Sequence, residues 1–446
     1  MNIGPHCNNR SRTFKRLGSP GLNMGFRDLV DGIRTVKDPI SVNYDMKIAS
    51  ESSGNQPLLF NEIIESHGQR AVTNILTRHR LCDAFDVEPG ELIDILSWAM
   101  ENPCDTVPVD PGSAPVLENR MAHTDISILP IPWHYREDGG RYQSSSIIIA
   151  QYGGQRNTSF HRQLLKGPDR TTVRLVPRHL RTMADQAYEN NEDVPIAVVN
   201  GPDPLVLLAA AMSFNEPIDE LRVASALHER LYGVKLGLVE LPNGVQVPAE
   251  SEYAMEARIT TKLDDEGPYV DITGTVDDIR QEPVIEYDSI YHRNEPIFHA
   301  LIPAGVEHMT LMGMPRAPTI KTAVSEVVTC TDVYLTDGGS GWLSSVVQIV
   351  PENSGDSMRA IRAALDGHKS MKQVIVVDTD IDVTNSTRVE WALMTRWQPD
   401  KDTLILSDQK GSSLDPSRSP EGTTSKIGFD ATIEPGADRT PFESVL

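Results

Sequence analysis

A run of apolar residues at positions 147–150, Ile-Ile-Ile-Ala, is the segment that most constrains the fold of this chain. Its β-branched residues and its length are typical of a buried strand, and Gly153-Gly154 supplies a turn after it. A polar segment, residues 157–162 (Asn-Thr-Ser-Phe-His-Arg), follows that turn. We interpret it as the segment around which the chain is organised, provided that residues 178–180 and 266–271 converge on it.

The length of 446 residues exceeds one ordinary core and predicts two or three domains. A hydrophobic content of 39% is enough for packed cores and excludes a disordered protein. No run reaches the roughly 18 consecutive apolar residues of a membrane helix, and residues 204–212 predict a buried helix instead. The sequence therefore predicts a soluble globular protein without a membrane span.

The formal net charge of −22 argues against non-specific binding to nucleic acid. The cysteines are far apart and form no CxxC or zinc spacing, so we expect reduced thiols and a cytoplasmic location. Residues 1–23 are basic and contain no acidic side chain. We interpret them as a poorly ordered extension, or as residues upstream of a true start at Met24.

Hydrophobic periodicity divides the remaining chain into three parts and predicts an α/β (α+β) fold. Residues 24–121 mix helical patterns, one of them at 57–67, with short strands, and predict an N-terminal α/β domain. Residues 122–315 are richer in strands and predict a barrel or sandwich with two inserted helices. Residues 316–446 alternate strand and helix and predict a small α/β domain.

Two pairs of polar residues share an unusual spacing. Asn157 and Arg162 are five residues apart, and neither a straight strand nor a regular helix aims both at one point. The segment is therefore expected to bend; the alternative is a polar loop with an exposed arginine. Glu266 and Asp271 have the same spacing, with a Gly-Pro turn between them. That turn would bring two carboxylates to one pocket and separate their pKa values, unless the segment is only an acidic β-turn.

Two further candidates stand at predicted helix starts. His179 follows Arg178, and Glu220 begins the next long helix. Asn, His and Glu side chains together with a phosphate oxygen form a hard site that favours Mn²⁺ or Mg²⁺ over zinc. The alternative is a histidine that caps a helix and a glutamate favoured in the first turn by the helix dipole. The pattern alone leaves both interpretations open.

Several motifs, taken in chain order, resemble the UbiD-type decarboxylases. They are NTSFHR (157–162), RLVPRHL (174–180), LLAAAMSFNEPIDE (207–220), QVPAESEYAMEARI (246–259), EGPYVD (266–271), VEHMTLMG (306–313), VVDTDIDVTNSTRVEWALMTR (376–396) and SKIGFDAT (425–432). The resemblance implies reversible decarboxylation of an α,β-unsaturated or aromatic carboxylic acid with prenylated FMN. It also implies an N-terminal α/β part, a central split β-barrel that binds the flavin, and a C-terminal α/β domain that forms a homo-oligomer, either a dimer or a hexamer.

The resemblance assigns cofactor contacts by their place in these motifs. It implies that Asn157, His179 and Glu220 bind Mn²⁺ or Mg²⁺ on the cofactor phosphate. The other implied cofactor contacts are Thr158, Ser159, Phe160, His161, Arg162, Arg178, Met212 and Lys426. K⁺ is implied beside Ala209, Ala210 and Met212. The family often has Ser where Ala210 stands, so one side-chain ligand for K⁺ is missing here.

The resemblance also implies catalytic roles. Arg162 would bind the substrate carboxylate and pair with Glu266. Glu266 would protonate the carbon that loses CO₂, and Asp271 would tune and position that pair. A flavin reductase that binds FMN without decarboxylation remains an alternative, although it has no need of these three side chains.

The motif forms FHR and VPRHL are most similar to an archaeal branch of the family. That branch includes an enzyme that converts trans-anhydromevalonate 5-phosphate to isopentenyl phosphate in a modified mevalonate pathway. His161, Arg178 and His308 would then hold the substrate phosphate. A flavin prenyltransferase would supply the cofactor. The alternative substrate is an aromatic acid of the 4-hydroxybenzoate type, as in quinone biosynthesis.

Overall fold

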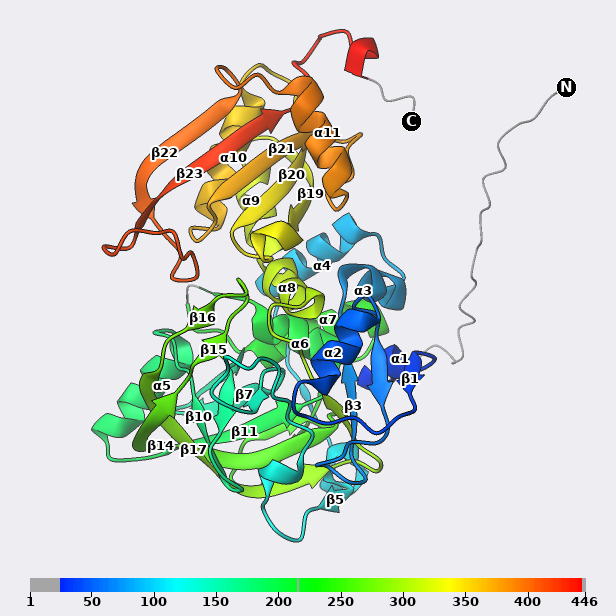
Figure 1. Ribbon diagram of the computed structural model, residues 1–446, viewed down its shortest axis with the longest axis vertical. Helices are drawn as coiled ribbons and strands as arrows, with labels where there is room; N and C mark the ends of the chain where they lie inside the picture. The colour runs from blue at the N-terminus through cyan, green and yellow to red at the C-terminus, as the bar shows by residue number, and fades with distance from the viewer. Residues whose placement is uncertain (1–24, 215, 443–446) are drawn as a thin grey trace, which may run out of the picture.

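The computed structural model of the protein describes residues 25–214 and 216–442 (Figure 1). These residues form helices together with sheets of four, nine, three, two and five strands, which confirms the α/β class. The five-stranded sheet occupies one end of the molecule and the nine-stranded sheet the other (Figure 1). Within these ranges, no helix combines the length and apolar character required to cross a membrane. The extension predicted at residues 1–23 lies outside the described residues.

The N-terminal sheet has the strand order β1-β2-β3-β18. Its strands are β1 (Arg34–Val36), β2 (Leu58–Phe60), β3 (Arg70–Thr73) and β18 (Ile297–His299), and the helices of this part are α1 (Phe26–Val30), α2 (Asp45–Ser52), α3 (Arg78–Phe85) and α4 (Pro89–Glu101). The helix predicted at 57–67 is wrong. Leu58 and Phe60 are buried in β2, which pairs with β1 on one side and β3 on the other. Long-range strand pairing therefore overrides the local spacing.

The nine-stranded sheet follows the order β6-β9-β10-β17-β14-β11-β7-β8, with β5 paired to β17. Its strands are β5 (Asn119–Arg120), β6 (Tyr142–Gln143), β7 (Ile147–Tyr152), β8 (Gln155–Phe160), β9 (Gln163–Leu165), β10 (Arg170–Val173), β11 (Val194–Asn200), β14 (Tyr253–Glu266) and β17 (Arg280–His292). In the described part of the chain β6 and β8 do not pair, so the sheet is open rather than a closed barrel. The apolar run at 147–150 begins β7 and is buried between β8 and β11.

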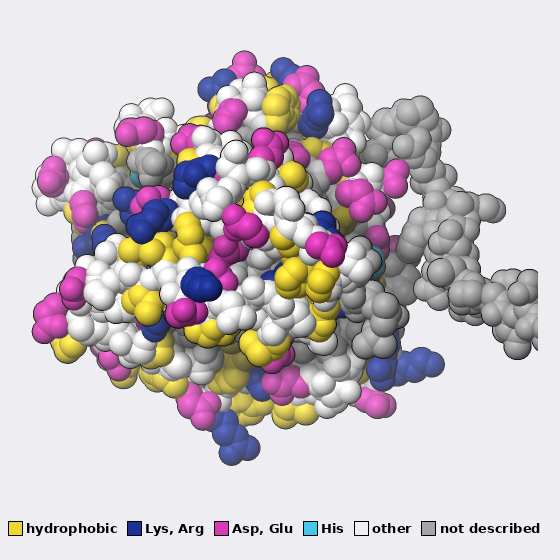
Figure 2. Space-filling view, turned by 90° about the horizontal axis from the view of Figure 1, so that it is seen from above, with side chains coloured by type: hydrophobic (Ala, Val, Ile, Leu, Met, Phe, Trp, Pro, Cys, Tyr) yellow, Lys and Arg dark blue, Asp and Glu magenta, His cyan; other side chains and the backbone are white. Residues whose placement is uncertain are grey.

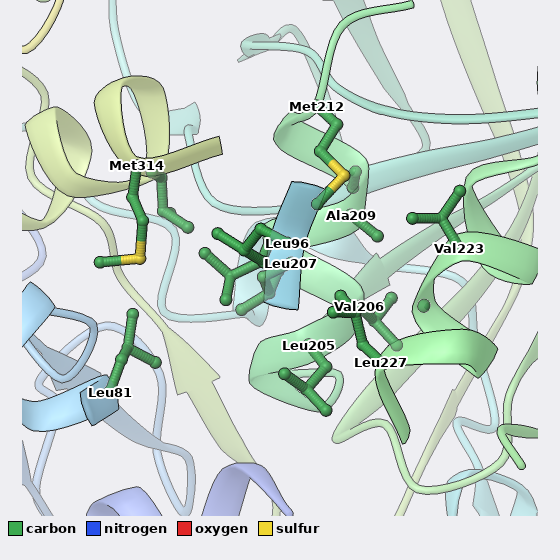
Figure 3. Close-up of a cluster of buried hydrophobic side chains, with 14 of the residues drawn as sticks. Leu81, Leu96, Leu205, Val206, Leu207, Ala209, Met212, Val223, Leu227 and Met314 are labelled. Carbon is green, nitrogen blue, oxygen red and sulfur yellow. The ribbon is translucent and has the colours of Figure 1, made fainter. Parts of the chain in front are cut away.

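Two small sheets, β13-β12-β4 and β15-β16, and three helices border the nine-stranded sheet. Their bounds are β4 (Val107–Pro108), β12 (Gly237–Glu240), β13 (Gln246–Pro248), β15 (Tyr269–Val270), β16 (Val276–Asp277), α5 (His179–Glu189), α6 (Pro204–Ala211) and α7 (Glu220–Tyr232). The predicted buried helix is α6, whose residues are buried from Pro204 to Ala210. Figure 3 shows its side chains among those of α4 and α7, represented by Leu96 and Leu227. This apolar helix therefore forms the centre of the largest core.

The C-terminal sheet has the order β19-β20-β21-β23-β22. Its elements, with the preceding helices, are α8 (Val306–Gly313), α9 (Ala317–Ser325), β19 (Thr329–Leu335), β20 (Ser344–Val350), α10 (Asp356–Gly367), β21 (Gln373–Asp378), α11 (Ser386–Arg396), β22 (Thr403–Lys410) and β23 (Thr423–Ala431). Short 3-10 helices are η1 (Pro111–Ser113), η2 (Pro115–Leu117), η3 (Ile126–Ile128), η4 (Met314–Arg316), η5 (Asp337–Gly339) and η6 (Thr440–Phe442). Helix α8 lies between this sheet and the rest of the molecule (Figure 1). On the face seen in Figure 2, basic and acidic side chains are interspersed.

Glu307, in the first turn of α8, joins this helix to the N-terminal sheet. Its fully buried carboxylate accepts hydrogen bonds from the backbone N–H groups of residues 74, 75 and 76 at 3.0, 3.1 and 2.9 Å. Nε2 of His299, at the end of β18, lies 2.9 Å from Oε1 of Glu307. Burial alone would raise the pKa of Glu307, but His299 and the backbone donors lower it overall. The ionised carboxylate is therefore the form that the fold stabilises.

We expect Glu307→Ala to lower the free energy of unfolding by about 3 kcal/mol at neutral pH, because it leaves buried N–H groups without an acceptor. The folded pKa lies below the ordinary value of 4.5, so this stabilisation is present above that pH and is lost as pH falls through the folded pKa. Urea unfolding of wild type and variant at several pH values measures both effects. Glu229→Ala, on the exposed face of α7, is the control and should change little. Equal stability of Glu307→Ala and wild type at neutral pH would contradict this account.

Candidate functional site

The side chain of Arg162 is the centre of a cluster of carboxylates. Arg162 lies in the connection between β8 and β9, and its side chain is 9% exposed. Its Nε and Nη2 donate to the two oxygens of Glu266, each at 2.9 Å. Its Nη1 donates to Asp271 at 2.8 Å, and Nη2 also donates to Asp277 at 2.8 Å. The predicted convergence of segments 157–162 and 266–271 is confirmed, whereas the catalytic roles stay predictions.

Aromatic side chains enclose this ion cluster. The guanidinium carbon of Arg162 lies 4.5 Å from the centroid of the Tyr269 ring, which packs against the Tyr142 ring at 4.6 Å. The hydroxyl of Tyr142 donates to Oε1 of Glu266 at 3.2 Å. Burial alone would lower the pKa of Arg162, but hydrogen bonds and charges from the three carboxylates raise it overall. The guanidinium is therefore a permanent cation in a partly enclosed site.

A tight hairpin delivers Asp271 and Asp277 to the guanidinium. Strands β15 and β16 pair in antiparallel register, with Tyr269 opposite Asp277. Gly267, directly after β14, has a φ of +104°, and a Cβ there would lie 2.8 Å from the backbone oxygen of Asp278. Only glycine tolerates that backbone and that close approach. The Gly-Pro turn predicted from the sequence therefore does return the chain to the site.

A second polar cluster joins β8 to the start of α7. Nδ2 of Asn157 donates to Oε1 of Glu220 at 3.0 Å, and the backbone N–H of Thr158 donates to Oε2 at 2.7 Å. Arg156 forms an ion pair at 2.6 Å with Asp219, the N-cap residue of α7, and so fixes the helix start against the strand. Burial raises the pKa of Glu220 to about 8. A cation bound at this carboxylate would favour its ionised form.

The bend expected within residues 157–162 lies only at positions 161 and 162, because residues 157–160 continue β8. Asn157, Ser159 and His161 are therefore neighbours on one face: Oγ of Ser159 lies 2.9 Å from Oδ1 of Asn157 and 2.9 Å from Nε2 of His161. Nδ1 of His161 lies 3.0 Å from the carbonyl oxygen of Arg174. Burial lowers the pKa of His161 to about 4. Its ring is thus neutral with both nitrogens engaged, which argues against the predicted phosphate contact.

His179 forms no hydrogen bond to Asn157 or Glu220. It is the first residue of α5, a helix that packs against β8. Among residues 25–214 and 216–442, no three His, Cys, Asp or Glu side chains gather as a metal-binding group. Met212, the C-cap residue of α6, is buried. Of the predicted metal ligands, the structure brings Asn157 and Glu220 together and leaves His179 on the neighbouring helix.

Four basic side chains from different elements influence one another: Arg178 before α5, Arg316 in η4, His368 after α10 and Lys426 in β23. None of the four forms a salt bridge in the described ranges. Arg316 lies 5.3 Å over the ring of Trp342, which packs against His368 at 4.4 Å. Burial, followed by the charge of Arg178, lowers the pKa of Arg316 to about 10. Burial, followed by the charge of Arg316, lowers the pKa of His368 to about 3, so its ring is neutral. The three remaining cations have no salt-bridge partner in the described ranges, which suits an anionic ligand.

Sequence reasoning missed Asp277, Tyr142 and Arg316. Asp277 is the first residue of the pair Asp277-Asp278, which resembles an ordinary acidic turn in the sequence. Only the β15–β16 register brings Asp277 to the guanidinium of Arg162. Tyr142 lies in a strand of two residues, which is too short to leave a pattern. Arg316 follows Pro315 at the end of a helical stretch, and only its packing on Trp342 singles it out.

Comparison with known proteins assigns most of this chain to one family. Residues 107–306 match UbiD, the 3-octaprenyl-4-hydroxybenzoate carboxy-lyase Rift-related domain, and residues 309–431 match the C-terminal domain of the same carboxy-lyase. The UbiD-class enzyme HmfF from Pelotomaculum thermopropionicum, solved in complex with FMN, superposes with a TM-score of 0.89 and 32% identity. That match covers 95% of this chain and 97% of HmfF.

Two archaeal relatives extend the similarity over nearly the whole chain. The anhydromevalonate phosphate decarboxylase of Methanosarcina mazei is 39% identical over 420 residues, which cover 92% of this chain and 96% of the relative. That of Methanothermobacter thermautotrophicus is 41% identical over 375 residues, 83% of this chain and 86% of the relative. The family matches, these relatives and the shared fold lead to one conclusion: the chain belongs to the UbiD family of carboxy-lyases.

Proposed function

We propose that this protein is a prenylated-FMN-dependent decarboxylase that converts trans-anhydromevalonate 5-phosphate to isopentenyl phosphate. The observation that carries the proposal is the buried guanidinium of Arg162, which is held by Glu266 and Asp271. Arg162 lies directly after β8, the strand whose Asn157 contacts Glu220 of α7. Archaeal decarboxylases named for this substrate resemble the chain over most of its length, which favours it over a 4-hydroxybenzoate-type acid.

The residues present fit the cofactor phosphate and its metal. Asn157 and Glu220 offer oxygen ligands of the kind that Mn²⁺ and Mg²⁺ prefer, and His179 would complete the set from α5. Arg178 and Lys426 would hold the phosphate, and K⁺ would lie beside Met212 at the end of α6. When bound, the modified flavin supplies the electron sink for CO₂ loss.

The chain itself binds the acid and delivers a proton. The guanidinium of Arg162 would orient the substrate carboxylate by charge-assisted hydrogen bonds. Tyr142 and Tyr269 keep water away from one side of that ion pair. The C–C bond to the carboxylate breaks, CO₂ leaves, and one proton from the enzyme takes its place on carbon.

The two carboxylates on Arg162 differ in their access to a substrate. Glu266 has a side-chain exposure of 0%, and both its oxygens accept from Arg162. The Asp271 side chain is 23% exposed and accepts from Nη1 alone of the guanidinium. We therefore assign proton donation to Asp271 and positioning of the guanidinium to Glu266, the reverse of the roles that the family resemblance gave them.

The substrate phosphate requires cations apart from those on the cofactor. Nδ1 of His308 in α8 accepts from the N–H of Ala304 at 3.1 Å, which leaves Nε2 to carry a proton and donate. Arg316 lies in η4, directly after the same helix. We assign the substrate phosphate to His308 and Arg316, and no longer to His161.

The location, the oligomeric state and the source of the cofactor are proposed from membership of the UbiD family. We place the enzyme in the cytoplasm as a homo-oligomer formed through the C-terminal domain, with the flavin held by the central domain. A separate flavin prenyltransferase would supply the cofactor. HmfF is also known in an evolved dimeric form with prenylated FMN, in keeping with an assembly of subunits.

Cofactor loading tests the flavin site. Protein co-produced with a flavin prenyltransferase should retain prenylated FMN together with Mn²⁺ or Mg²⁺, detected by mass spectrometry and metal analysis of the denatured sample. Glu220→Gln should lose most of both, because the amide cannot neutralise the metal. Glu229→Gln is the exposed control on the same helix. Ordinary FMN bound equally with and without the prenyltransferase would favour a flavin reductase instead.

Two isosteric replacements test the assignment of the proton donor. Asp271→Asn should lower kcat by about 10²–10⁴-fold, because an amide delivers no proton. Glu266→Gln should retain more activity, since its amide oxygen can still accept from Arg162. Release of CO₂ by holoenzyme measures both. A larger loss in Glu266→Gln than in Asp271→Asn would return the donor role to Glu266.

Arg316→Gln should raise KM for trans-anhydromevalonate 5-phosphate at least tenfold, because it removes one charged contact to the phosphate, worth about 1.5–3 kcal/mol. Flavin content should stay unchanged. Lys426→Gln should instead lower flavin content, because its cation is assigned to the cofactor. Arg362→Gln, exposed on α10, is the control. Loss of flavin in Arg316→Gln would place Arg316 on the cofactor.

A further inference from the structure

Arg162 has little capacity left for a substrate. A guanidinium has five N–H groups, arranged to take carboxylates two N–H groups at a time. Glu266 occupies Nε and one N–H of Nη2. The second N–H of Nη2 goes to Asp277 and one of Nη1 goes to Asp271. Only one N–H of Nη1 remains, so a fourth carboxylate cannot bind in bidentate form without displacing one of the three already there.

We propose that Asp277 occupies, in the free enzyme, the place on Arg162 that the substrate carboxylate takes, and that it yields this place when the acid binds. The inference rests on the proposed role of Arg162 in carboxylate binding. It makes Asp277 a positioning residue that sets the affinity of the site for carboxylates, in addition to Arg162, Glu266 and Asp271.

Three observations single out Asp277 among the carboxylates on Arg162. Like Asp271, it makes one hydrogen bond to the guanidinium, whereas Glu266 makes two and is fully buried. Its side chain is 27% exposed, the largest fraction of the three. It also has a second cation, since Nη1 of Arg280 lies 2.6 Å from the same Oδ2.

Arg280 can keep the carboxylate of Asp277 in an ion pair after Arg162 has released it. Asp277 and Arg280 lie three residues apart, where the β15–β16 hairpin leads into β17. The Arg280 side chain is 37% exposed, so the pair can move toward solvent without leaving a buried charge unpaired. Electrostatics also favours release, because a fourth carboxylate on one guanidinium would add like-charge repulsion.

The test measures carboxylate affinity in the holoenzyme with 3-methylbutanoate, an acid that lacks the reactive double bond. We expect Asp277→Ala to lower the Kd for this acid about fivefold by calorimetry, the scale of one partly exposed ion pair. The Kd for the uncharged 3-methylbutanamide should not change. Arg280→Gln should raise the Kd for the acid, because Asp277 then depends on Arg162 alone. Asp278→Ala, the exposed neighbour, is the matched control.

If Asp277 has only a structural role, the change in the Kd for 3-methylbutanoate has the opposite sign. If Asp277 only holds Arg162 in place, Asp277→Ala and Asp277→Asn will raise the Kd for 3-methylbutanoate and the KM for the substrate together, and that result would overturn the proposal. Thermal unfolding of each variant verifies that it folds. Absence of CO₂ release by the wild type would refute the proposed function, while the ratio of Kd values would still decide the place of Asp277.

Discussion

The buried charge of Arg162 is the constraint on which the geometry of the site depends. A guanidinium that is 9% exposed is costly unless carboxylates pair with it, and the chain provides three. Glu266 ends β14, and the other two carboxylates lie on the hairpin that follows it. The chain must therefore turn sharply at Gly267, in a backbone conformation that only glycine adopts readily. The Tyr269 ring then covers the guanidinium. The arrangement of this corner of the molecule follows from the need to neutralise one cation.

A second set of groups is incompletely neutralised by the protein. The buried carboxylate of Glu220 has a raised pKa, and Arg178 and Arg316 have lowered ones, with burial as the leading cause in each case. Opposite shifts of this kind are expected where a phosphate and a cation are part of the working site. The Arg156–Asp219 ion pair fixes the start of α7, and Glu220 with it, without the ligand. A preorganised contact of this kind would lower the entropy cost of binding the proposed cofactor.

The overall charge gives these local cations added importance. At −22 the protein as a whole would repel the proposed substrate, an acid that also carries a phosphate. Binding therefore depends on short-range contacts in a site shielded from solvent, where charge pairs are stronger than at the surface. The residues of this basic group come from different parts of the fold. Arg316 lies in η4, directly after α8, and Lys426 lies in β23 of the C-terminal sheet.

The sequence by itself determined the α/β class, the buried strand at β7, the buried helix α6 and the motifs of the UbiD family. These depend on local composition and order, which the chain carries without its fold. The convergence of Arg162 with Glu266 and Asp271 was predictable because the Gly-Pro turn left a signal. The tertiary structure alone decided the strand at β2, the position of Asp277 and the packing of Arg316 on Trp342. Each of these results from pairing or packing between residues far apart in the chain, and such contacts leave no periodicity in the sequence.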